Sequence, residues 1–280
     1  MVVATTPQSG ETVRFHAPIG HLGPMTKYPI FHSGYPAAEN LTVDWRDVPI
    51  RDARTIDGGA SLASHGFAVV DFPSRVRDFS DPAAIAVSYA QEIVEIVKSV
   101  TGASEVLAPS AGIASRFSDR RGVVARAERA ARFSHNDFTP CSTGIHIANE
   151  YPEVNRARLN GRIAAYNLWR CITPPPQDMP LALCDPRSIS LADLVTAEAR
   201  YGPPESYGVW GEVALLRFNP AHRWYCFPEM RPNEILIFAG YDSDSRYPSI
   251  VPHTAIEDPN CPQDAPSRWN IDIRCYALFD

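Results

Sequence analysis

Residues 212–218 (EVALLRF) and 224–227 (WYCF) begin the stretch that decides the fold, a series of short β-type segments that runs to the end of the chain. The last of these segments is residues 269–279 (WNIDIRCYALF). Short strands at this spacing, with no helical pattern between them, are typical of an antiparallel barrel or sandwich. The pair Asn219-Pro220 between the first two segments predicts that they form a hairpin.

The clearest helical pattern lies upstream, at residues 82–100. Asp81 is placed to cap this helix, Pro82 suits its first turn, and Gly102 follows its end. Its apolar side chains recur every fourth residue, so they form a stripe that would face a core. One long helix before a run of strands indicates a mainly β fold with flanking helices.

Three further segments complete the predicted organisation. Residues 62–71 have the pattern of a first strand, and residues 162–172 that of another strand, which ends before a run of prolines. Residues 1–58 are rich in proline, glycine and histidine and show no sustained periodicity, so we expect an N-terminal arm packed on the core. Residues 59–280 are expected to form a single domain.

The amino-acid composition limits the classes of protein to which this chain can belong. An apolar fraction of 45% is ample for a core, whereas a net charge of −6 and a pI near 5.8 argue against a nucleic-acid partner. The six cysteines are scattered without a C-x-x-C motif, which indicates reduced thiols. We see no secretory signal at the start, and no apolar run approaches the ~18 residues of a membrane span. A soluble cytoplasmic protein is expected.

The pattern His135-Asn136-Asp137 is the candidate for a metal site. On an extended strand, a histidine and a carboxylate two residues apart project from the same face and can bind one metal ion. A second histidine from a distant strand would complete the two-His-one-carboxylate set, which leaves sites open on non-heme Fe(II) for substrate and dioxygen. Because a His-x-Asp pattern is common, the prediction depends on the strand-rich setting around it.

We choose His253 as the second histidine. His146 is too near His135 in the chain to come easily from a distant strand, and His222 follows a turn. In a double-stranded β-helix (jelly roll), alternate residues of the strands point inward, so the strands that carry residues 135, 137 and 253 could line one cavity.

The last segment offers a site for a co-substrate. Fe(II) needs two further electrons to activate dioxygen for C–H cleavage, and 2-oxoglutarate can supply them. Its distal carboxylate calls for arginine, whose guanidinium forms a bidentate fork. One face of the last segment carries alternating polar residues: Arg268, Asn270, Asp272 and Arg274. Surface ion pairs are the alternative role for its two arginines.

The stretch 116–132 is rich in arginine and runs directly into His135. A solvated helix face explains it without a ligand. Alternatively, one of these arginines meets an anionic substrate, and we take Arg116 and Arg132 as candidates for the substrate pocket.

Three sequence blocks carry a family resemblance. Residues 166–172 (YNLWRCI), 180–188 (PLALCDPRS) and 230–238 (MRPNEILIF) resemble the AsaB-like hydroxylase/desaturase family, which includes fungal gibberellin desaturases and the cephamycin-pathway hydroxylase component. The resemblance extends from about residue 65 to the C-terminus, with its blocks in the family's order.

The resemblance implies an Fe(II)- and 2-oxoglutarate-dependent oxygenase with a jelly-roll core, which uses dioxygen to hydroxylate, desaturate or oxidatively cyclise a small natural-product intermediate. Residues His135, Asp137 and His253 would be the iron ligands. In the family's C-terminal pattern a serine accompanies the arginine that binds 2-oxoglutarate. Asn270 stands in its place here, so the choice between Arg268 and Arg274 stays open.

Alternation along residues 162–172 favours Asn167 and Trp169 as pocket-facing residues. Two other functions are compatible with the same residues. An Fe(II) oxidase could draw its electrons from the substrate and need no 2-oxoglutarate. A barrel could also serve as a non-catalytic accessory partner of a biosynthetic enzyme. Neither the substrate nor an oligomeric state is predicted.

Overall fold

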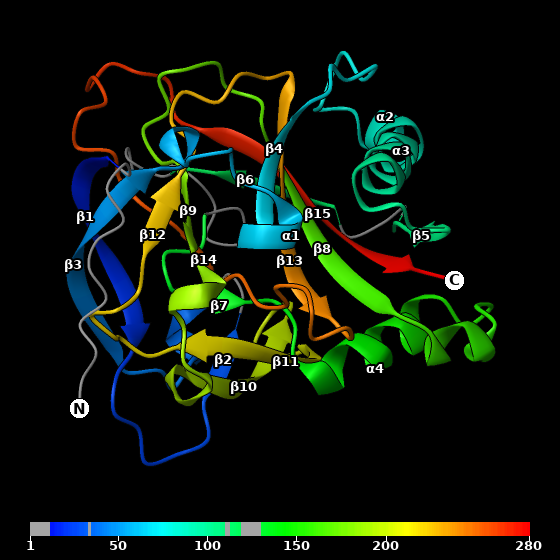
Figure 1. Ribbon diagram of the computed structural model, residues 1–280. Coiled ribbons are helices and arrows are strands. Elements are labelled where there is room, and N and C mark those ends of the chain that lie inside the picture. Colours follow the sequence, from blue (N-terminus) through cyan, green and yellow to red (C-terminus); the bar gives the residue numbers. More distant parts are fainter. Residues whose placement is uncertain (1–11, 33–34, 110–112, 119–129) are drawn as a thin grey trace.

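Two curled β-sheets that face each other make up the body of the molecule (Figure 1). The computed structural model describes residues 12–32, 35–109, 113–118 and 130–280. This is the expected jelly roll, mainly β with flanking helices. Most of the arginine-rich stretch, residues 119–129, lies outside the described residues.

The larger sheet has nine strands in the described chain. Their order is β1 (Val13–Leu22), β3 (Val43–Asp52), β12 (Trp224–Cys226), β9 (Leu181–Cys184), β14 (His253–Ala255), β7 (His135–Asn136), β11 (Gly208–Leu216), β10 (Leu194–Tyr201) and β2 (Ile30–His32). Strands from the predicted N-terminal arm, β1, β2 and β3, therefore pair within the sheet. The domain boundary at residue 58 stays a prediction.

The hairpin predicted between β11 and β12 is wrong. Strand β11 pairs with β10 and β7, whereas β12 pairs with β3 and β9. The turn between them is bound to Asp193, whose carboxylate accepts a hydrogen bond from the Asn219 amide and lies 3.1 Å from His222 Nε2. These contacts turn the chain away from β11 toward β9 instead of folding it back on itself.

The smaller sheet holds six described strands. Their order is β4 (Phe67–Asp71), β13 (Glu234–Asp242), β8 (Ile163–Cys171), β15 (Trp269–Leu278) and β5 (Glu105–Leu107), with β6 (Ala114–Phe117) also paired to β15. All nine residues of β8 are buried, because the larger sheet lies on one side of it and a helix on the other.

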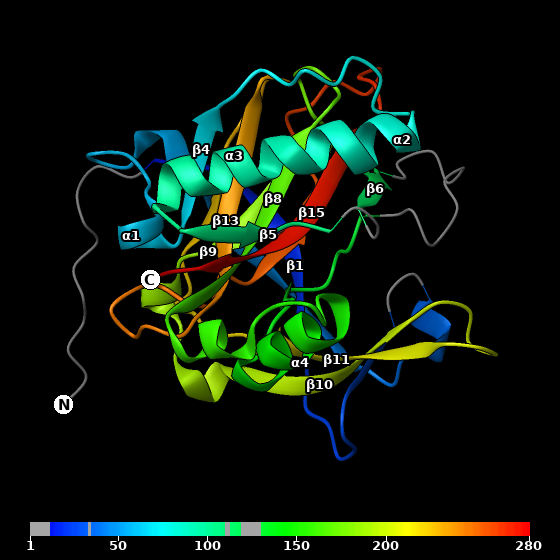
Figure 2. The same ribbon diagram turned by 90° about the vertical axis from the view of Figure 1, so that its right-hand side faces the viewer.

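The covering helix is the one expected at residues 82–100. It consists of α2 (Pro82–Ala84), a π-helical turn (Ile85–Tyr89) and α3 (Ala90–Thr101), and it crosses the outer face of the smaller sheet (Figure 2). The Asp81 carboxylate accepts a hydrogen bond from the Ala83 amide at 2.9 Å, and Gly102 ends the helix at a φ of 72°. The buried face of α3 packs into the main hydrophobic core.

Shorter helical segments connect the strands. They are α1 (Leu62–His65), α4 (Pro140–Glu150) and the 3-10 turns Pro36–Ala38, Ala53–Thr55, Arg156–Asn160, Pro186–Ser188 and Leu191–Asp193. The strand predicted at residues 62–71 thus begins only at Phe67. Ser61 caps a short helix before it, and Gly66, at a φ of 73°, ends that helix. Among the described residues, no helix is long and apolar enough to cross a membrane.

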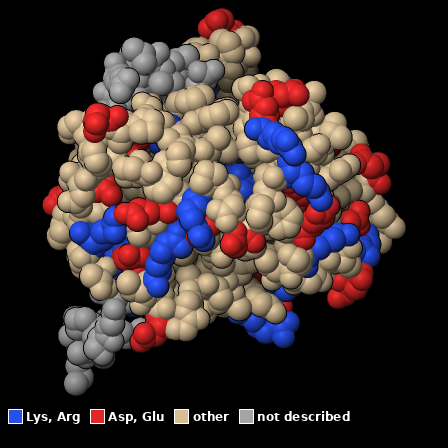
Figure 3. Space-filling view, turned by 90° about the horizontal axis from the view of Figure 1, so that it is seen from above, with Lys and Arg blue, Asp and Glu red and all other residues tan. Residues whose placement is uncertain are grey.

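Charged side chains of both signs are interspersed on the face shown in Figure 3. Acidic and basic groups alternate over this surface rather than gathering by sign. Such a mixture keeps a surface solvated without building a strong field of one sign.

Candidate metal centre

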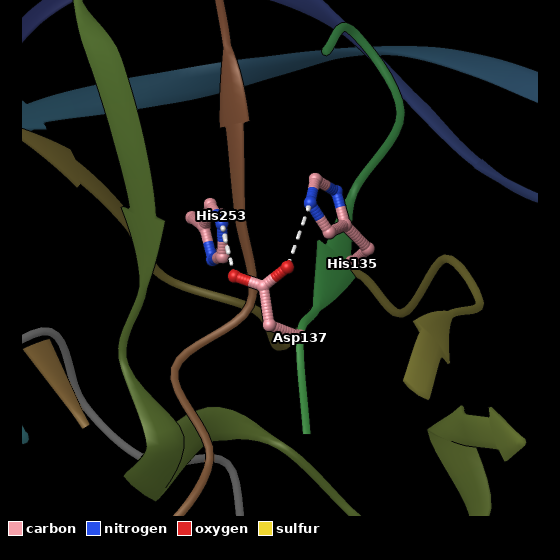
Figure 4. Close-up of side chains that lie close together, drawn as sticks. All are labelled: His135, Asp137 and His253. Carbon is pink, nitrogen blue, oxygen red and sulfur yellow. Dashed lines mark ion pairs between the residues drawn. The ribbon is translucent and has the colours of Figure 1, made fainter. Parts of the chain in front are cut away.

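The two histidines of the predicted triad lie on adjacent strands of the larger sheet. His135 on β7 is the antiparallel register partner of His253 on β14, and Asp137 follows His135 by two residues. All three side chains point toward one another (Figure 4). Each offers a ligand atom, and these atoms lie within 4.8 Å of one another. The arrangement could hold one metal ion.

Backbone carbonyls orient both imidazoles. His135 Nδ1 donates to the Phe133 carbonyl at 2.7 Å, and His253 Nδ1 donates to the Val251 carbonyl at 3.2 Å. A carbonyl oxygen can only accept, so each Nδ1 carries the proton and leaves the Nε2 lone pair of a neutral ring for a metal. Fixing the second nitrogen in this way is what metal-binding histidines generally require.

Asp137 is held as a carboxylate. Burial raises its pKa, but the Arg274 guanidinium, with Nη2 2.9 Å from Oδ1, acts together with His253, His135 and a hydrogen bond from Asn167 and lowers the pKa of Asp137 to about 2. Burial lowers the pKa of His253 to about 3, so its ring is neutral at pH 7. Ionised carboxylate and neutral imidazole are the forms that bind metals. Two imidazoles and one carboxylate fit Fe(II).

The residue between the ligands fixes their strand. Asn136 is fully buried, and its Nδ2 donates to the Phe138 carbonyl at 2.7 Å and to the Gly240 carbonyl of β13 at 2.9 Å. These bonds join the end of β7 to the smaller sheet. Because side chains alternate along the strand, anchoring Asn136 on one side directs His135 and Asp137 to the other.

A cavity of about 410 Å³ between the sheets contains the triad. Every residue that the sequence predicted for the site lines it: His135, Asp137, His253, Arg268, Asn270, Arg274, Asn167, Trp169, Arg116 and Arg132. Asp272, on the same face of β15, lines it too. Arg170, the neighbour of Trp169, instead bonds the Phe72 and Pro232 carbonyls away from the cavity.

Arg268 is a buried guanidinium that faces the cavity. Its Nη1 donates to the Met179 carbonyl at 2.7 Å, and the group lies 5.5 Å from the centre of the Trp169 ring. Within the described part of the chain, Nε has no hydrogen-bond partner and no carboxylate lies within ion-pair distance. Burial lowers the pKa of Arg268. Asp178 and Asp272 act on it electrostatically without forming an ion pair, so this buried cation at a cavity is suited to an anionic ligand.

Three other polar residues of the cavity lie beside protein neighbours. The Asn270 amide donates to Asp272 Oδ1 at 3.1 Å. Arg132 pairs with Glu257 at 2.8 Å and lies over the Trp45 ring at 5.6 Å. Arg116 lies on β6, in register with Asn270, so a helix face does not describe it.

Several cavity residues escaped sequence reasoning. Phe31 stacks on His135 with ring centres 5.4 Å apart, and Phe238 meets His253 edge-on at 4.7 Å. Tyr201 and Trp45 line the same cavity. Phe31 and Trp45 come from the proline-rich first 58 residues, where no periodicity marked a strand. The competing histidines lie elsewhere: His146 is on α4, and His222 pairs with Asp193.

Comparisons with known proteins agree with this geometry. A family model described as "Oxidoreductase/YMDC permease-like domain" matches residues 15–278. The Fe(II)/2-oxoglutarate-dependent dioxygenase nvfI of Aspergillus novofumigatus is 30% identical over 253 residues, which cover 87% of each chain. The hydroxylase/desaturase efuI of Hormonema carpetanum is 26% identical over 266 residues and 88% of each chain.

A solved structure shows the same fold over nearly the whole length. The iron and alpha-ketoglutarate-dependent endoperoxidase NvfI superposes with a TM-score of 0.82 at 26% identity, covering 97% of this chain and 99% of that one. With the family model spanning most of the sequence and a buried His-Asp-His triad in the cavity, the chain belongs to the family of Fe(II)/2-oxoglutarate-dependent dioxygenases and hydroxylase/desaturases of natural-product biosynthesis.

Proposed function

We propose that His135, Asp137 and His253 bind Fe(II) and that the cavity oxidises a small-molecule natural-product intermediate by hydroxylation, desaturation or oxidative cyclisation. When bound, Fe(II) with 2-oxoglutarate and dioxygen supplies an oxidant strong enough to break a C–H bond. The protein orients the ligands through the Phe133 and Val251 carbonyls. Aromatic rings against the histidines, Phe31 and Phe238, exclude water from the reacting centre.

Arg268 is the residue that we assign to the distal carboxylate of 2-oxoglutarate. The observation that carries this assignment is its buried charge, with which no carboxylate of the described residues forms an ion pair. Arg274, the alternative, already pairs with Asp137. One N–H of the Asn270 amide is bound to Asp272, and its second N–H is available to assist Arg268.

The substrate would occupy the side of the cavity formed by the larger sheet. This wall is mostly apolar and includes Phe31, Trp45, Phe133 and Leu181. Arg132 and Arg116 lie among the lining residues as candidates for polar groups of the substrate. A cytoplasmic location stays a prediction, with which six free cysteines are compatible.

Calorimetric titration of 2-oxoglutarate into the Mn(II)-loaded protein tests the co-substrate site. Removing one partner of a buried charge pair costs about 2–5 kcal/mol, so we expect Arg268→Met to bind 2-oxoglutarate about 30-fold more weakly or worse. Arg54→Met is the matched control, because Arg54 pairs with Glu234 outside the cavity. Native affinity in Arg268→Met would refute the assignment.

A further inference from the structure

Arg274 connects the two sheets at the triad. Its side chain leaves β15 of the smaller sheet, and its Nη2 lies 2.9 Å from Oδ1 of Asp137, which follows β7 of the larger sheet. The guanidinium also lies over the ring of Tyr201, at the end of β10, with 5.9 Å to the ring centre. It is therefore held from the larger sheet by both a charge and an aromatic ring.

The two oxygens of Asp137 have different surroundings. Oδ1 faces Arg274 and lies 3.9 Å from His135 Nε2, whereas Oδ2 lies 3.6 Å from His253 Nε2. A free carboxylate can turn about its last bond and present either oxygen, or both, to a metal. A charge-assisted hydrogen bond to one oxygen restricts that rotation.

The geometry points to Arg274 as a positioning residue that holds Oδ1 of Asp137 and leaves Oδ2 to the metal. This role rests on the proposed iron site. It separates the two arginines: no carboxylate of the described residues forms an ion pair with Arg268, whereas Arg274 pairs with Asp137. The arginine would thereby prevent the carboxylate from occupying a coordination site that the reaction needs.

Two physical effects of Arg274 on metal affinity oppose each other. Orientation of Asp137 strengthens binding, and loss of such outer contacts generally weakens metal affinity about 10- to 100-fold. Repulsion between the guanidinium and a divalent cation weakens binding, so its removal would strengthen it. Orientation is expected to dominate, so the positioning role requires weaker metal binding when Arg274 is removed.

The test is calorimetric titration of the metal-free protein with Mn(II), in the absence of 2-oxoglutarate. We expect Arg274→Met to bind Mn(II) about 10- to 100-fold more weakly than the native protein. Arg274→Lys, which keeps the charge but loses the planar fork, should lie between the two. If Arg274→Met does not fold, the Mn(II) affinity of Arg274→Lys tests the proposal instead. Unchanged or tighter binding in these variants would overturn the positioning role.

Controls separate this role from loss of stability and from failure of the iron site. Arg54→Met removes an arginine–carboxylate fork outside the cavity. It should bind Mn(II) as the native protein does. If Arg54→Met lost as much Mn(II) affinity as Arg274→Met, Arg274 would have only a structural effect. Native affinity in His135→Ala would instead refute the metal site itself.

Discussion

Arg274 lies on β15 and Arg268 directly precedes that strand, and the two arginines differ in their electrostatic surroundings. Alternation along residues 268–274 placed both on one face, and both line the cavity. What separates them is that Arg274 meets Asp137, 137 positions earlier in the chain. No local pattern relates these residues, because an ion pair between two sheets is a product of the tertiary fold. The sequence could therefore not assign the two roles.

The proposed iron ligands were more predictable. Residues 135 and 137 share a face by strand geometry alone, and His253 was the histidine whose place in the chain suited a distant strand. In the structure the three side chains lie together in one buried cluster. The residues that orient them were hidden, because carbonyls such as that of Val251 carry no sequence signal.

A histidine outside the cavity gives a prediction about pH. His21, on β1, is fully buried against Phe218 and Trp224, and burial lowers its pKa from 6.5 to about 4. The unfolded chain takes up a proton near pH 6.5, whereas the folded chain does so only near pH 4. The stabilising contribution is therefore complete above pH 6.5 and is lost as the pH falls through 4. It amounts to at most about 3 kcal/mol.

Urea unfolding at pH 7.5 and at pH 4.5 measures this contribution. Replacing the ring by one that cannot be protonated, in His21→Phe, should make the free energy of unfolding fall less between the two pH values than in the native protein. His16→Phe, at an exposed ring of the same strand, is the control. Equal losses in His21→Phe and the native protein would show that His21 does not contribute.

At the level of elements, the site depends on a strand of only two residues. Strand β7 could not hold His135 by its own ladder, and the Asn136 side chain ties it to the Gly240 carbonyl. At this point the register between β13 and β8 shifts between Ala239 and Tyr241. A two-residue strand leaves no periodic signal, so the strand at His135 was inferred from the metal-ligand pattern, and the irregularity in β13 was not predicted.

Gly240 has no room for a side chain. A Cβ at this position would lie 2.2 Å from the ring of Phe138, the residue after Asp137. Gly240→Ala must displace that ring, and overpacking of this kind costs about 1–3 kcal/mol. We expect urea unfolding to show this loss of stability, together with weaker Mn(II) binding by calorimetry.

Gly144→Ala is the matched control for this substitution. Gly144 lies in α4 with no atom within 4 Å of an added Cβ, and alanine is favoured over glycine in a helix by about 1 kcal/mol. It should leave Mn(II) binding unchanged. Native stability and metal affinity in Gly240→Ala would contradict the close packing of Phe138.

Elements with strong local signals were predicted well. The helix at residues 82–100 has a cap, a proline and a terminal glycine, and all three act as expected. The prediction of a hairpin after β11 was wrong because a turn motif indicates that the chain bends but not which strand it pairs with next. That choice is made by Asp193, which binds the turn through Asn219 and His222.

Over the whole molecule, the cavity is a joint product of both sheets. The two histidines come from the larger sheet and Asp137 directly follows β7, whereas Arg274 comes from β15 of the smaller sheet and Arg268 directly precedes it. Strands from residues 13–52 add Phe31 and Trp45 to the cavity wall. The fold class followed from the density of strands and from the family resemblance. Strand order did not, because pairing of distant segments is decided by packing.

Anaerobic titration with Fe(II) and 2-oxoglutarate examines the iron and co-substrate site directly, because chelation of the keto acid to Fe(II) produces a visible charge-transfer band. We expect the band in the native protein and its loss in His135→Ala. Arg268→Met should need a higher concentration of 2-oxoglutarate to develop it. Absence of the band from the native protein, or an undiminished band in His135→Ala, would contradict an iron centre at His135, Asp137 and His253.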